Sequence, residues 1–463
     1  MKRITTLLGA LLLVLCFGAG QAVAADGGGA AQTAGQSAPS GQTADGSGSA
    51  YQAGPSNSAG SIRVLSPGNG GAVSQSNSTT AAAIAANANK TNQSTSQSQT
   101  GGFPGSNTQI AGQAAENKQD ADADANAVQI APSNSVGSIR VLSPGNDGDV
   151  TQSNSATAGA AALNGNQTDQ SVDQSQAGGA APSYADEKKP DDKSGSGSDY
   201  TQVAGQAASN HQDADADATA VQVKPSNTAS SIRVLSPGND GDVSQSNDAT
   251  AVGIAANLNK TDQSIDQDQS GTGQGSDYTQ IAGQEASNKQ DADADALAVQ
   301  LKPSNSNQSI RVLSPGNDGD VSQSNSTTAV AAALNANKTD QSIDQSQTGG
   351  GHGGSYLQVA GQGAWSRQDA DAGAAAFQFG ASNENAPIRV LSPGGSGSVE
   401  QSNDVTALAV ALNLNETCQA LMQSQSGHGS DYTQVAGQGS WDDQRGGAWS
   451  HAIQGGMPKH KKR

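Results

Sequence analysis

Acidic turns are the part of this 463-residue sequence whose residue types and spacing come nearest to a chemical site. The sequence GNDGDV begins at Gly145, Gly238 and Gly316, and each copy places an Asn and two Asp in a Gly-rich turn. Closely spaced oxygen ligands suit Ca²⁺, so a weak calcium site is one interpretation of this motif. Its candidate ligands are Asp240, Asp242, Asp318 and Asp320.

Two related turns argue for a simpler interpretation. The corresponding segments at 68–73 and 394–399 have the sequences GNGGAV and GGSGSV, which lack the carboxylates. The motif also lacks the nine-residue register of calcium-binding β-roll repeats. Turn formation alone is therefore the favoured interpretation, and we expect no cofactor beyond weakly bound calcium.

No catalytic constellation is present in the sequence. The five histidines fall at unrelated positions, and the glycines do not form a phosphate-binding loop between a strand and a helix. These histidines are His211, His352, His428, His451 and His460. We predict that the protein is not an enzyme.

The composition limits both the core and the partners. Only 33% of residues are hydrophobic and 3% are aromatic, so large apolar side chains are too few for several ordinary cores. The net charge of −19 argues against a nucleic-acid partner and favours solubility and cation binding.

The N-terminus has the features of a secretion signal. Lys2 and Arg3 precede the apolar run 7–17, and AVA at 22–24 fits a small-residue cleavage site. We therefore predict a signal peptide at 1–25 and a secreted protein that is extracellular or bound to the cell surface. No other segment is apolar enough to predict a transmembrane span in the mature chain.

Internal repeats organise the rest of the sequence. The phrase IRVLSPG recurs at steps of 77, 93, 78 and 78 residues, and Gln-x-Ala-Gly-Gln recurs between its copies. We call the segments that begin at Gln-x-Ala-Gly-Gln the A segments and those that follow IRVLSPG the B segments. Six A and five B segments alternate, which is typical of a repeat array.

The repeats predict the following organisation. The signal peptide is followed by a degenerate N-terminal A segment that acts as a cap, then a B segment with its connector, four A+B repeats, a polar linker inserted within the array, and a C-terminal A segment with an aromatic cap and a basic tail. Their respective bounds are 26–57 for the cap, 58–107 for the first B segment, 108–182, 200–276, 277–354 and 355–430 for the repeats, 183–199 for the linker, and 431–463 for the C-terminal segment.

A period of two runs through every A and B segment. One phase contains almost only Gln, Asn, Ala and Thr, whereas the other varies among charged, small and aromatic residues. Period two belongs to strands, so we predict an all-β solenoid of stacked coils whose Gln, Asn and Ala side chains point inward and form ladders. The predicted ladder residues are Gln280, Gln284, Asn288, Gln290, Gln323, Asn325, Asn335, Asn337, Gln341 and Gln345.

The length of the segments predicts their internal shape. A straight strand of about 22 residues would extend ~73 Å, which is too long for an ordinary strand. We therefore expect each segment to turn as a strand–arc–strand unit. Chain disorder and helical repeats are the alternatives, and the strict parity argues against both.

The varying phase supplies the expected outer surface. The Asp runs at 120–124, 213–217 and 291–295 would form rows along stacked coils, where mutual repulsion would raise the pKa of some carboxyl groups. They serve as a solvated acidic face, with divalent-ion binding as the alternative. Aromatic residues gather towards the C-terminal end of the array and predict an interaction surface or a cap. They include Trp365, Trp441, Trp449 and Phe377.

The repeated units resemble the curlin-type repeats of bacterial functional amyloid. TQVAGQAASNHQ at 201–212 and QSNSTTAVAAALNANKTDQ at 323–341 carry this resemblance, which covers about two thirds of the mature chain. It implies an extracellular structural role, as a matrix, a surface layer or an adhesive fibre. Curlin repeats are of a single type and tandem, whereas two types alternate here, which leaves polymerisation open.

Two classes of function remain. The first is a secreted structural protein that self-associates or contacts cell-envelope polymers. The basic tail at 459–463 would favour either contact, with a solvated chain end as the alternative interpretation of this segment. The second is an extracellular binding module whose regular outer face recognises a repeating ligand, such as a polysaccharide or ice. Because the inward phase is more regular than the outward phase, the sequence favours the structural class.

Overall fold

The computed structural model describes residues 23–24, 30–101, 105–178, 198–271, 275–349, 353–428 and 431–456. Across these ranges the chain forms strands and turns without a helix, which confirms the all-β prediction. Most of the predicted signal peptide at 1–25, all but residues 23–24, lies outside the described residues, as do most of the linker at 183–199 and the basic tail. In the described part of the chain, no helix has the length and apolarity to span a membrane.

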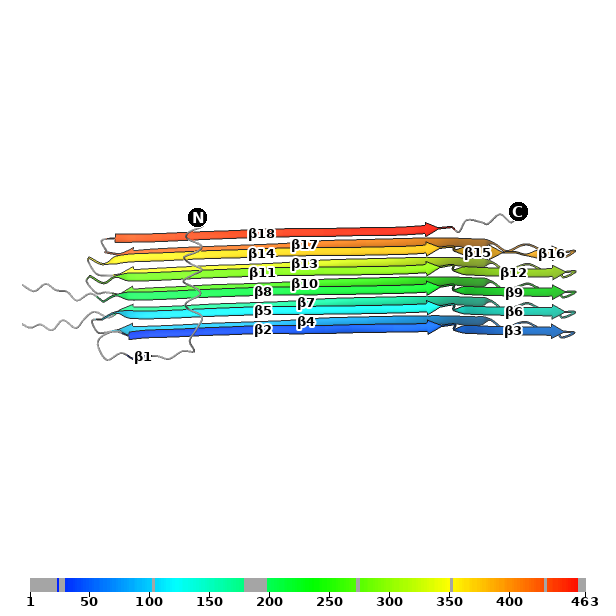
Figure 1. Cartoon of the computed structure of the whole chain (residues 1–463), viewed down its shortest axis with the longest axis horizontal. Coiled ribbons are helices and arrows are strands. Elements are labelled where there is room, and N and C mark those ends of the chain that lie inside the picture. The colour runs from blue at the N-terminus through cyan, green and yellow to red at the C-terminus, as the bar shows by residue number, and fades with distance from the viewer. Residues whose placement is uncertain are drawn as a thin grey trace, which may run out of the picture.

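Three parallel sheets make up the fold (Figure 1). The A segments form one sheet, the B segments form a second, and short strands between them form a third. The A strands, in sheet order, are β2 (Ala30–Ala53), β5 (Asn107–Ile130), β8 (Tyr200–Val223), β11 (Tyr278–Leu301), β14 (Ser355–Phe379) and β18 (Asp431–Gly455). The B strands are β4 (Val73–Gly101), β7 (Val150–Gly178), β10 (Val243–Gly271), β13 (Val321–Gly349) and β17 (Val399–Gly427). The short strands are β3 (Ser56–Val64), β6 (Ser133–Val141), β9 (Ser226–Val234), β12 (Ser304–Val312), β15 (Ser382–Asn385) and β16 (Ile388–Val390). The two-residue β1 (Val23–Ala24) pairs antiparallel with β2.

Each coil of the solenoid is one complete repeat. An A strand runs outward, a short strand and the IRVLSPG turn form the arc, and a B strand returns. Equivalent positions pair directly, so that Gln280 lies between Gln202 and Gln358 in its sheet. The longer step of 93 residues leaves this register unchanged, because Asn107 still pairs with Tyr200. The linker is thus an insertion between coils that does not alter the stack.

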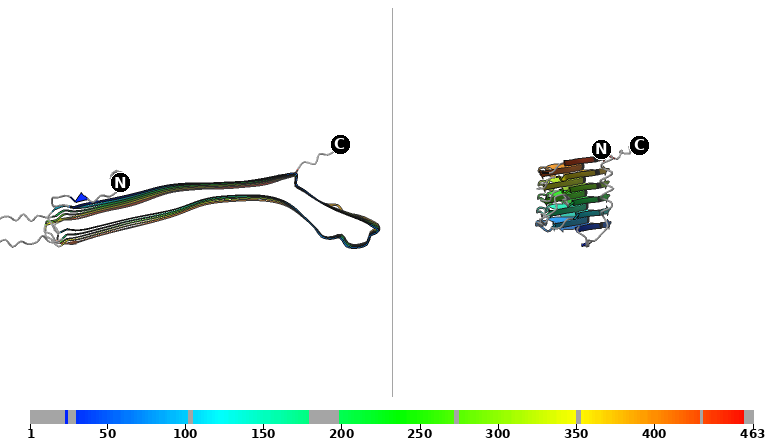
Figure 2. Two further views of the ribbon diagram at one scale, coloured as in Figure 1. Left: turned by 90° about the horizontal axis from the view of Figure 1, so that it is seen from below. Right: turned by 90° about the vertical axis from the view of Figure 1, so that its left-hand side faces the viewer.

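The predicted arc within each segment is wrong in its position. Every A segment is one strand of 24 or 25 residues, every B segment is one strand of 29 residues, and the arc lies between them (Figure 2). A B strand is therefore about 96 Å long. Such length is possible because an equivalent strand of the next coil pairs with it along all 29 residues, as in the pairing of β10 with β13.

The arcs contain residues in the left-handed region of φ. Leu313 has a φ of 49° and Lys302 has a φ of 51°, while Gly54 and Gly380 occupy the position equivalent to Lys302 in the first and last coils. A proline follows this position in four coils, at Pro55, Pro132, Pro225 and Pro303. A left-handed residue thus ends five of the A strands at a fixed point, and in four of them a proline follows it.

The core between the two long sheets consists of alanine. One cluster of 27 buried alanines fills the middle of the sandwich, where the layers in Figure 2 approach each other most closely. A Cβ atom at Gly46 would lie 2.6 Å from the carbonyl oxygen of Ile84, and one at Gly253 would lie 2.6 Å from that of Asp295. At these two glycines even a methyl group would be too close to the opposite backbone, and elsewhere in this middle zone alanine fills the space between the sheets.

Candidate functional site

Amide ladders occupy the interior on both sides of the alanine core. All ten predicted ladder residues are buried, with exposed fractions of 4% or less. Gln290 shows the pattern: its Nε2 donates to Oε1 of Gln212 in the preceding coil at 2.8 Å and to the carbonyl oxygen of Ala336 in the opposite sheet at 3.0 Å. Each buried glutamine of this kind links its neighbours along the stack and the two sheets across it.

The glutamine and asparagine ladders run in opposite directions. Glutamine amides donate towards the N-terminal end, as Gln345 does to Gln267, whereas asparagine amides donate towards the C-terminal end, as Asn335 does to Asn413 at 3.0 Å. The two ends of the stack therefore present different hydrogen-bonding groups. The C-terminal end presents glutamine acceptors and asparagine donors, and the N-terminal end presents the reverse.

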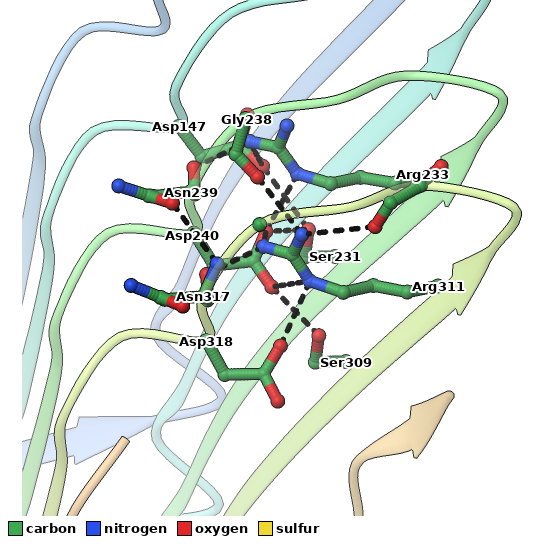
Figure 3. A network of polar contacts seen from close by, with 12 residues as sticks. Asp147, Ser231, Arg233, Gly238, Asn239, Asp240, Ser309, Arg311, Asn317 and Asp318 are labelled. Atoms are coloured by element: carbon green, nitrogen blue, oxygen red, sulfur yellow. Dashed lines mark hydrogen bonds and ion pairs between the residues drawn. The ribbon is translucent and has the colours of Figure 1, made fainter. Parts of the chain in front are cut away.

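A chain of buried ion pairs runs down the arcs (Figure 3). Arg233 and Arg311 are fully buried, and Asp240 lies between them, 2.6 Å from Nε of Arg233 and 3.1 Å from Nη2 of Arg311. Asp147 bridges Arg140 and Arg233 in the same way, at 2.6 and 2.9 Å. Arginine charges on both sides hold the pKa of Asp147 below its ordinary value, although burial alone would raise it.

The arrangement gives the predicted calcium ligands another role. Asp240 and Asp318 lie in the arginine chain, where Asp318 is 2.8 Å from Nε of Arg311. Asp242 and Asp320 are the exposed second aspartates, and each accepts a backbone N–H from the next coil, Asp242 from Asp320 at 2.9 Å and Asp320 from Ser398 at 2.7 Å. Within the described ranges no group of three or more His, Cys, Asp or Glu residues is placed to hold a metal ion. The carboxylates that the sequence suggested for a cation thus contact protein donors.

A small cavity lies beside this chain of ion pairs. Its volume is about 280 Å³, and it runs along the stack between the short strands and the acidic turns. Val136, Val243, Ser231 and Asp240 are among its lining residues. Three carboxylates line the cavity, those of Asp147, Asp240 and Asp318, and each lies within ion-pair distance of an arginine. Arg63, which also lines it, donates to the carbonyl oxygen of Asn69.

The outer side of the A sheet carries the acidic face. We give this name to the aspartate rows on β5, β8, β11 and β14, in which Asp215 pairs with Asp293 and Asp122 pairs with Asp215. Burial, followed by repulsion from neighbouring aspartates, raises the pKa of Asp215 to about 7 and that of Asp293 to about 6. The pKa shifts have the expected upward direction, but burial contributes more to them than the repulsion on which the expectation rested.

The opposite side of the molecule is apolar, which the sequence analysis missed. On the outer side of the B sheet, four successive outward positions in each of five strands hold only Ala, Gly, Val, Ile or Leu. We call these 20 residues the apolar patch: 82, 84, 86 and 88 of β4; 159, 161, 163 and 165 of β7; 252, 254, 256 and 258 of β10; 330, 332, 334 and 336 of β13; 408, 410, 412 and 414 of β17. Most of its large side chains are exposed, at 72% for Ile84, 42% for Ile254 and 46% for Leu412, whereas Val252, Val330 and Leu334 are half-buried.

The apolar patch and the acidic face lie back to back. Asn87, an inward residue of β4 between patch residues Ala86 and Ala88, donates from its Nδ2 to the carbonyl oxygen of Asp120, and Gly253 approaches the backbone of Asp295 across the core. Only the alanine layer separates the two surfaces. The signal that would have found the patch was the run of apolar outward residues from Val330 to Ala336, which recurs at the same offset in every B segment.

Aromatic residues stack at the C-terminal end of the array. Trp365 and Trp441 are 53% and 46% exposed and stack with ring centroids 4.8 Å apart on the outer side of the A sheet. Trp449 is half exposed and tilts against His451, and the half-buried Phe377 stacks on Phe379. These outward positions agree with the predicted phase. On the inward phase, Tyr200, Tyr278, Tyr356 and Tyr432 form a further aromatic ladder.

Long strands end the stack on both sides. In the described chain β17 and β18 close their sheets at the C-terminal end, and β4 closes its sheet at the other end. The N-terminal β2 differs because it contains Pro39, which is tolerated in a sheet where its missing N–H faces an edge. Its only further neighbour in the described chain is the two-residue β1.

Comparison with known proteins identifies no relative: no family model matches the chain, and neither the curated proteins nor the solved structures contain a match.

Proposed function

We propose that the protein is a secreted structural protein that self-associates end to end into fibres of a matrix or surface layer. The observation that carries this proposal is the pair of complementary open ends. A second copy placed on β18 through its own β2 would bring glutamine donors to glutamine acceptors and continue the parallel A sheet. Isolated edge strands of 24 residues are strong templates for such pairing.

Ladder geometry supports a head-to-tail contact. At the C-terminal end, Gln434 and Gln438 donate to the preceding coil, at 2.8 and 2.7 Å, and their Oε1 atoms face the open side. At the N-terminal end, Gln32 and Gln36 donate one hydrogen to the opposite sheet. Each of these glutamines retains a second amide N–H, which can donate to a glutamine Oε1 at the C-terminal end of another copy. The contact is heterologous, and a heterologous contact that does not close into a ring extends into a filament.

The numbers of A and B strands determine how many contacts form between two copies. Six A strands alternate with five B strands, and each B strand lies between two A strands. When β2 of the next copy pairs with β18, the A sheet continues, but one B position between β17 and the next β4 has no strand. The joint between copies therefore contains fewer contacts than any junction between coils of one copy, and we expect fibres to break there.

Negative-stain microscopy of the purified chain without its predicted signal peptide tests the proposal. We expect unbranched fibres, and X-ray diffraction from aligned fibres should give a cross-β reflection near 4.8 Å along their axis. Monodisperse short rods under all solution conditions would contradict end-to-end assembly.

A proline substitution provides the matched test of the C-terminal edge. Gly380 donates its backbone N–H to Gly455 of the next strand, so inward-phase residues of the A sheet direct their N–H groups towards the C-terminal end. Ala436→Pro would remove such a donor from the open edge of β18 without removing a bond to β14. We expect it to abolish fibres and leave the fold intact, whereas Ala436→Ser should form fibres. Equal fibre growth by the two variants would exclude β18 as the growing edge.

One observation favours the alternative of a binding module. A threonine stands at the same outward position of all five B strands, directly beside the apolar patch, and forms a straight row along the stack. These residues are Thr80, Thr157, Thr250, Thr328 and Thr406. A row with a spacing of about 4.8 Å suits a polysaccharide or an ice surface of matching repeat. Thr250→Val with Thr328→Val should then weaken ligand binding without affecting fibre formation.

A further inference from the structure

No segment in the described part of the chain covers the apolar patch. Its 20 positions form a grid of four columns and five rows on a nearly straight part of the B sheet, and the pairing of β10 with β7 and β13 keeps the columns in register. Two residues along a strand cover ~6.7 Å and strands are ~4.8 Å apart, so the grid covers about 650 Å². Contiguous apolar patches on soluble monomers are usually about 300–600 Å², so this surface is larger than a monomer ordinarily leaves in water.

The size and shape of the patch fit a second copy of the same surface. A standard interface buries about 800 Å² on each partner. The patch reaches that range together with the outward column on either side of it, which is the threonine row on one side and Lys90, Gln167, Lys260, Lys338 and Glu416 on the other. One column holds Ala86, Leu163, Ala256, Leu334 and Leu412 in stacking order, so hollows and ridges alternate from β4 to β13 and a second leucine ridge follows on β17. Two such faces can interdigitate as the inner faces of stacked sheets do, at a separation of about 10 Å.

Charge also favours a second copy over a lipid surface. In a face-to-face pair the two acidic faces lie on the outside, with four sheet layers between them. The distance between these faces is ~30 Å, which exceeds the Debye length of about 8 Å at physiological ionic strength. The net charge of −19 therefore opposes this pairing weakly, whereas it would repel the chain from an anionic membrane. The patch also contains no Trp or Tyr, the residues that anchor proteins at lipid interfaces.

We propose that the apolar patch is the contact face of a two-fold dimer in which the B sheets of two copies pack against each other. The pair buries both patches and presents an acidic face on each outer side. The contact is independent of end-to-end assembly, because it uses the side of the B sheet and not the edge of a strand. Where both contacts form, a fibre consists of two laterally paired stacks.

Sedimentation velocity of the mature chain over a wide range of concentrations tests the dimer. Face pairing is closed and stops at two copies, whereas end-to-end assembly is open and gives a series of larger species. We expect a species of twice the monomer mass for the wild type. Leu334→Glu with Leu412→Glu should abolish it, because the dimer would bury four unpaired charges.

A matched control separates the patch from the rest of the sheet. Ser324→Glu with Ser402→Glu places the same charges on the same two strands and the same outer face. These serines lie ten residues along the strand from the leucines, outside the patch, so the variant should keep the dimer. If the charged leucine variant fails to fold, Leu334→Ala with Leu412→Ala replaces it, since alanine already occupies this column in other coils. We expect its dimer to dissociate with a constant at least about tenfold larger than that of the wild type.

Three outcomes in solution would overturn the proposal, and a fourth concerns the fibres. They are a wild type that stays monomeric at every concentration, equal dimerisation of the leucine and serine variants, and flotation of the monomer with phosphatidylcholine vesicles in place of dimer formation. Fibres with the mass per length of a single stack would also overturn lateral pairing while leaving end-to-end assembly in place. Conversely, a dimer without fibres would contradict the proposed function and leave this inference standing.

Discussion

Nδ2 of Asn335 donates to Oδ1 of Asn413, the equivalent residue 78 positions later, at 3.0 Å, and also to the carbonyl oxygen of Asp369 in the opposite sheet. One side chain thus bonds along the stack and across it, while Asn257 donates to its Oδ1 from the coil before. This bifunctional use of an amide explains why the inward phase varies so little among the repeats.

Removing two ladder amides should destabilise the fold strongly. Asn335→Leu with Asn337→Leu leaves amides of the adjacent coils unpaired, and each unsatisfied buried group costs about 1–3 kcal/mol. The leucines also overfill a space sized for asparagine. We expect a marked fall in the denaturation midpoint. The control is Ser326→Leu with Lys338→Leu on the outward phase of the same strand, which should change the midpoint little. Similar losses for both pairs would contradict the inward assignment.

The acidic face should make the protein more stable in mild acid. The folded pKa values of Asp215 and Asp293, about 7 and about 6, lie above the ordinary value of 3.8. A folded state that binds protons more tightly than the unfolded state gains stability as pH falls through this window and loses it as pH rises. His211 opposes the trend, because burial and the charge of Lys289 lower its pKa. Thermal unfolding from pH 8 towards pH 4 should show the rise.

A triple substitution assigns this response to the aspartate rows. Asp291, Asp293 and Asp295, all changed to Asn, should raise the unfolding midpoint at neutral pH and flatten its pH dependence. The control changes Asp169, Asp262 and Asp340 to Asn, since these pair with lysines on the B sheet, at 3.8, 2.5 and 3.5 Å. It should retain the pH response. An unaltered profile in the first variant would show that the rows do not interact.

Breaking the buried ion-pair chain should be costly. Arg311→Met removes the charge between Asp240 and Asp318 and leaves both carboxylates short of a partner, and losses of about 3–5 kcal/mol are typical of such cases. Arg445→Met is the matched control, because Arg445 is an exposed residue of β18 that pairs with Asp443 at 3.0 Å. Its loss should stay within about 1 kcal/mol. Comparable effects in chemical denaturation would show that the arc contributes little to stability.

A glycine in the arc should stabilise the protein. Lys302 has a φ of 51°. At this φ the steric strain of a Cβ atom costs about 1–2 kcal/mol, and glycine has no Cβ and so avoids this strain. Lys302→Gly, which reproduces the residue found at Gly54 and Gly380, should therefore raise the denaturation midpoint. Lys289→Gly, in the extended part of β11, should lower it. A decrease for Lys302→Gly would mean that the lysine side chain makes a compensating contact.

Several features followed from the sequence because each depends on a periodic pattern. Alternation of amides and alanines along each segment sets which side chains point inward, and equal spacing of the repeats sets which positions pair. That is sufficient to predict an all-β stack in which Gln290 lies over Gln212 and Asn335 under Asn413. It is also sufficient to predict that neighbouring aspartates repel one another.

Other features required the tertiary structure. The length of a strand depends on whether a partner strand pairs with it throughout. The sequence of a single segment does not show this, so the expected arc within each segment was wrong. Asp240 meets Arg233 of its own turn and Arg311 of the next coil, and the second contact exists only after stacking. Likewise, the apolar patch consists of four-residue sets that are unremarkable in one strand and form a broad surface only when five strands align. The sequence by itself determined the inward face and the register, because both are local or periodic, whereas the arcs, ion pairs and outer surfaces arise between coils and were decided by the fold.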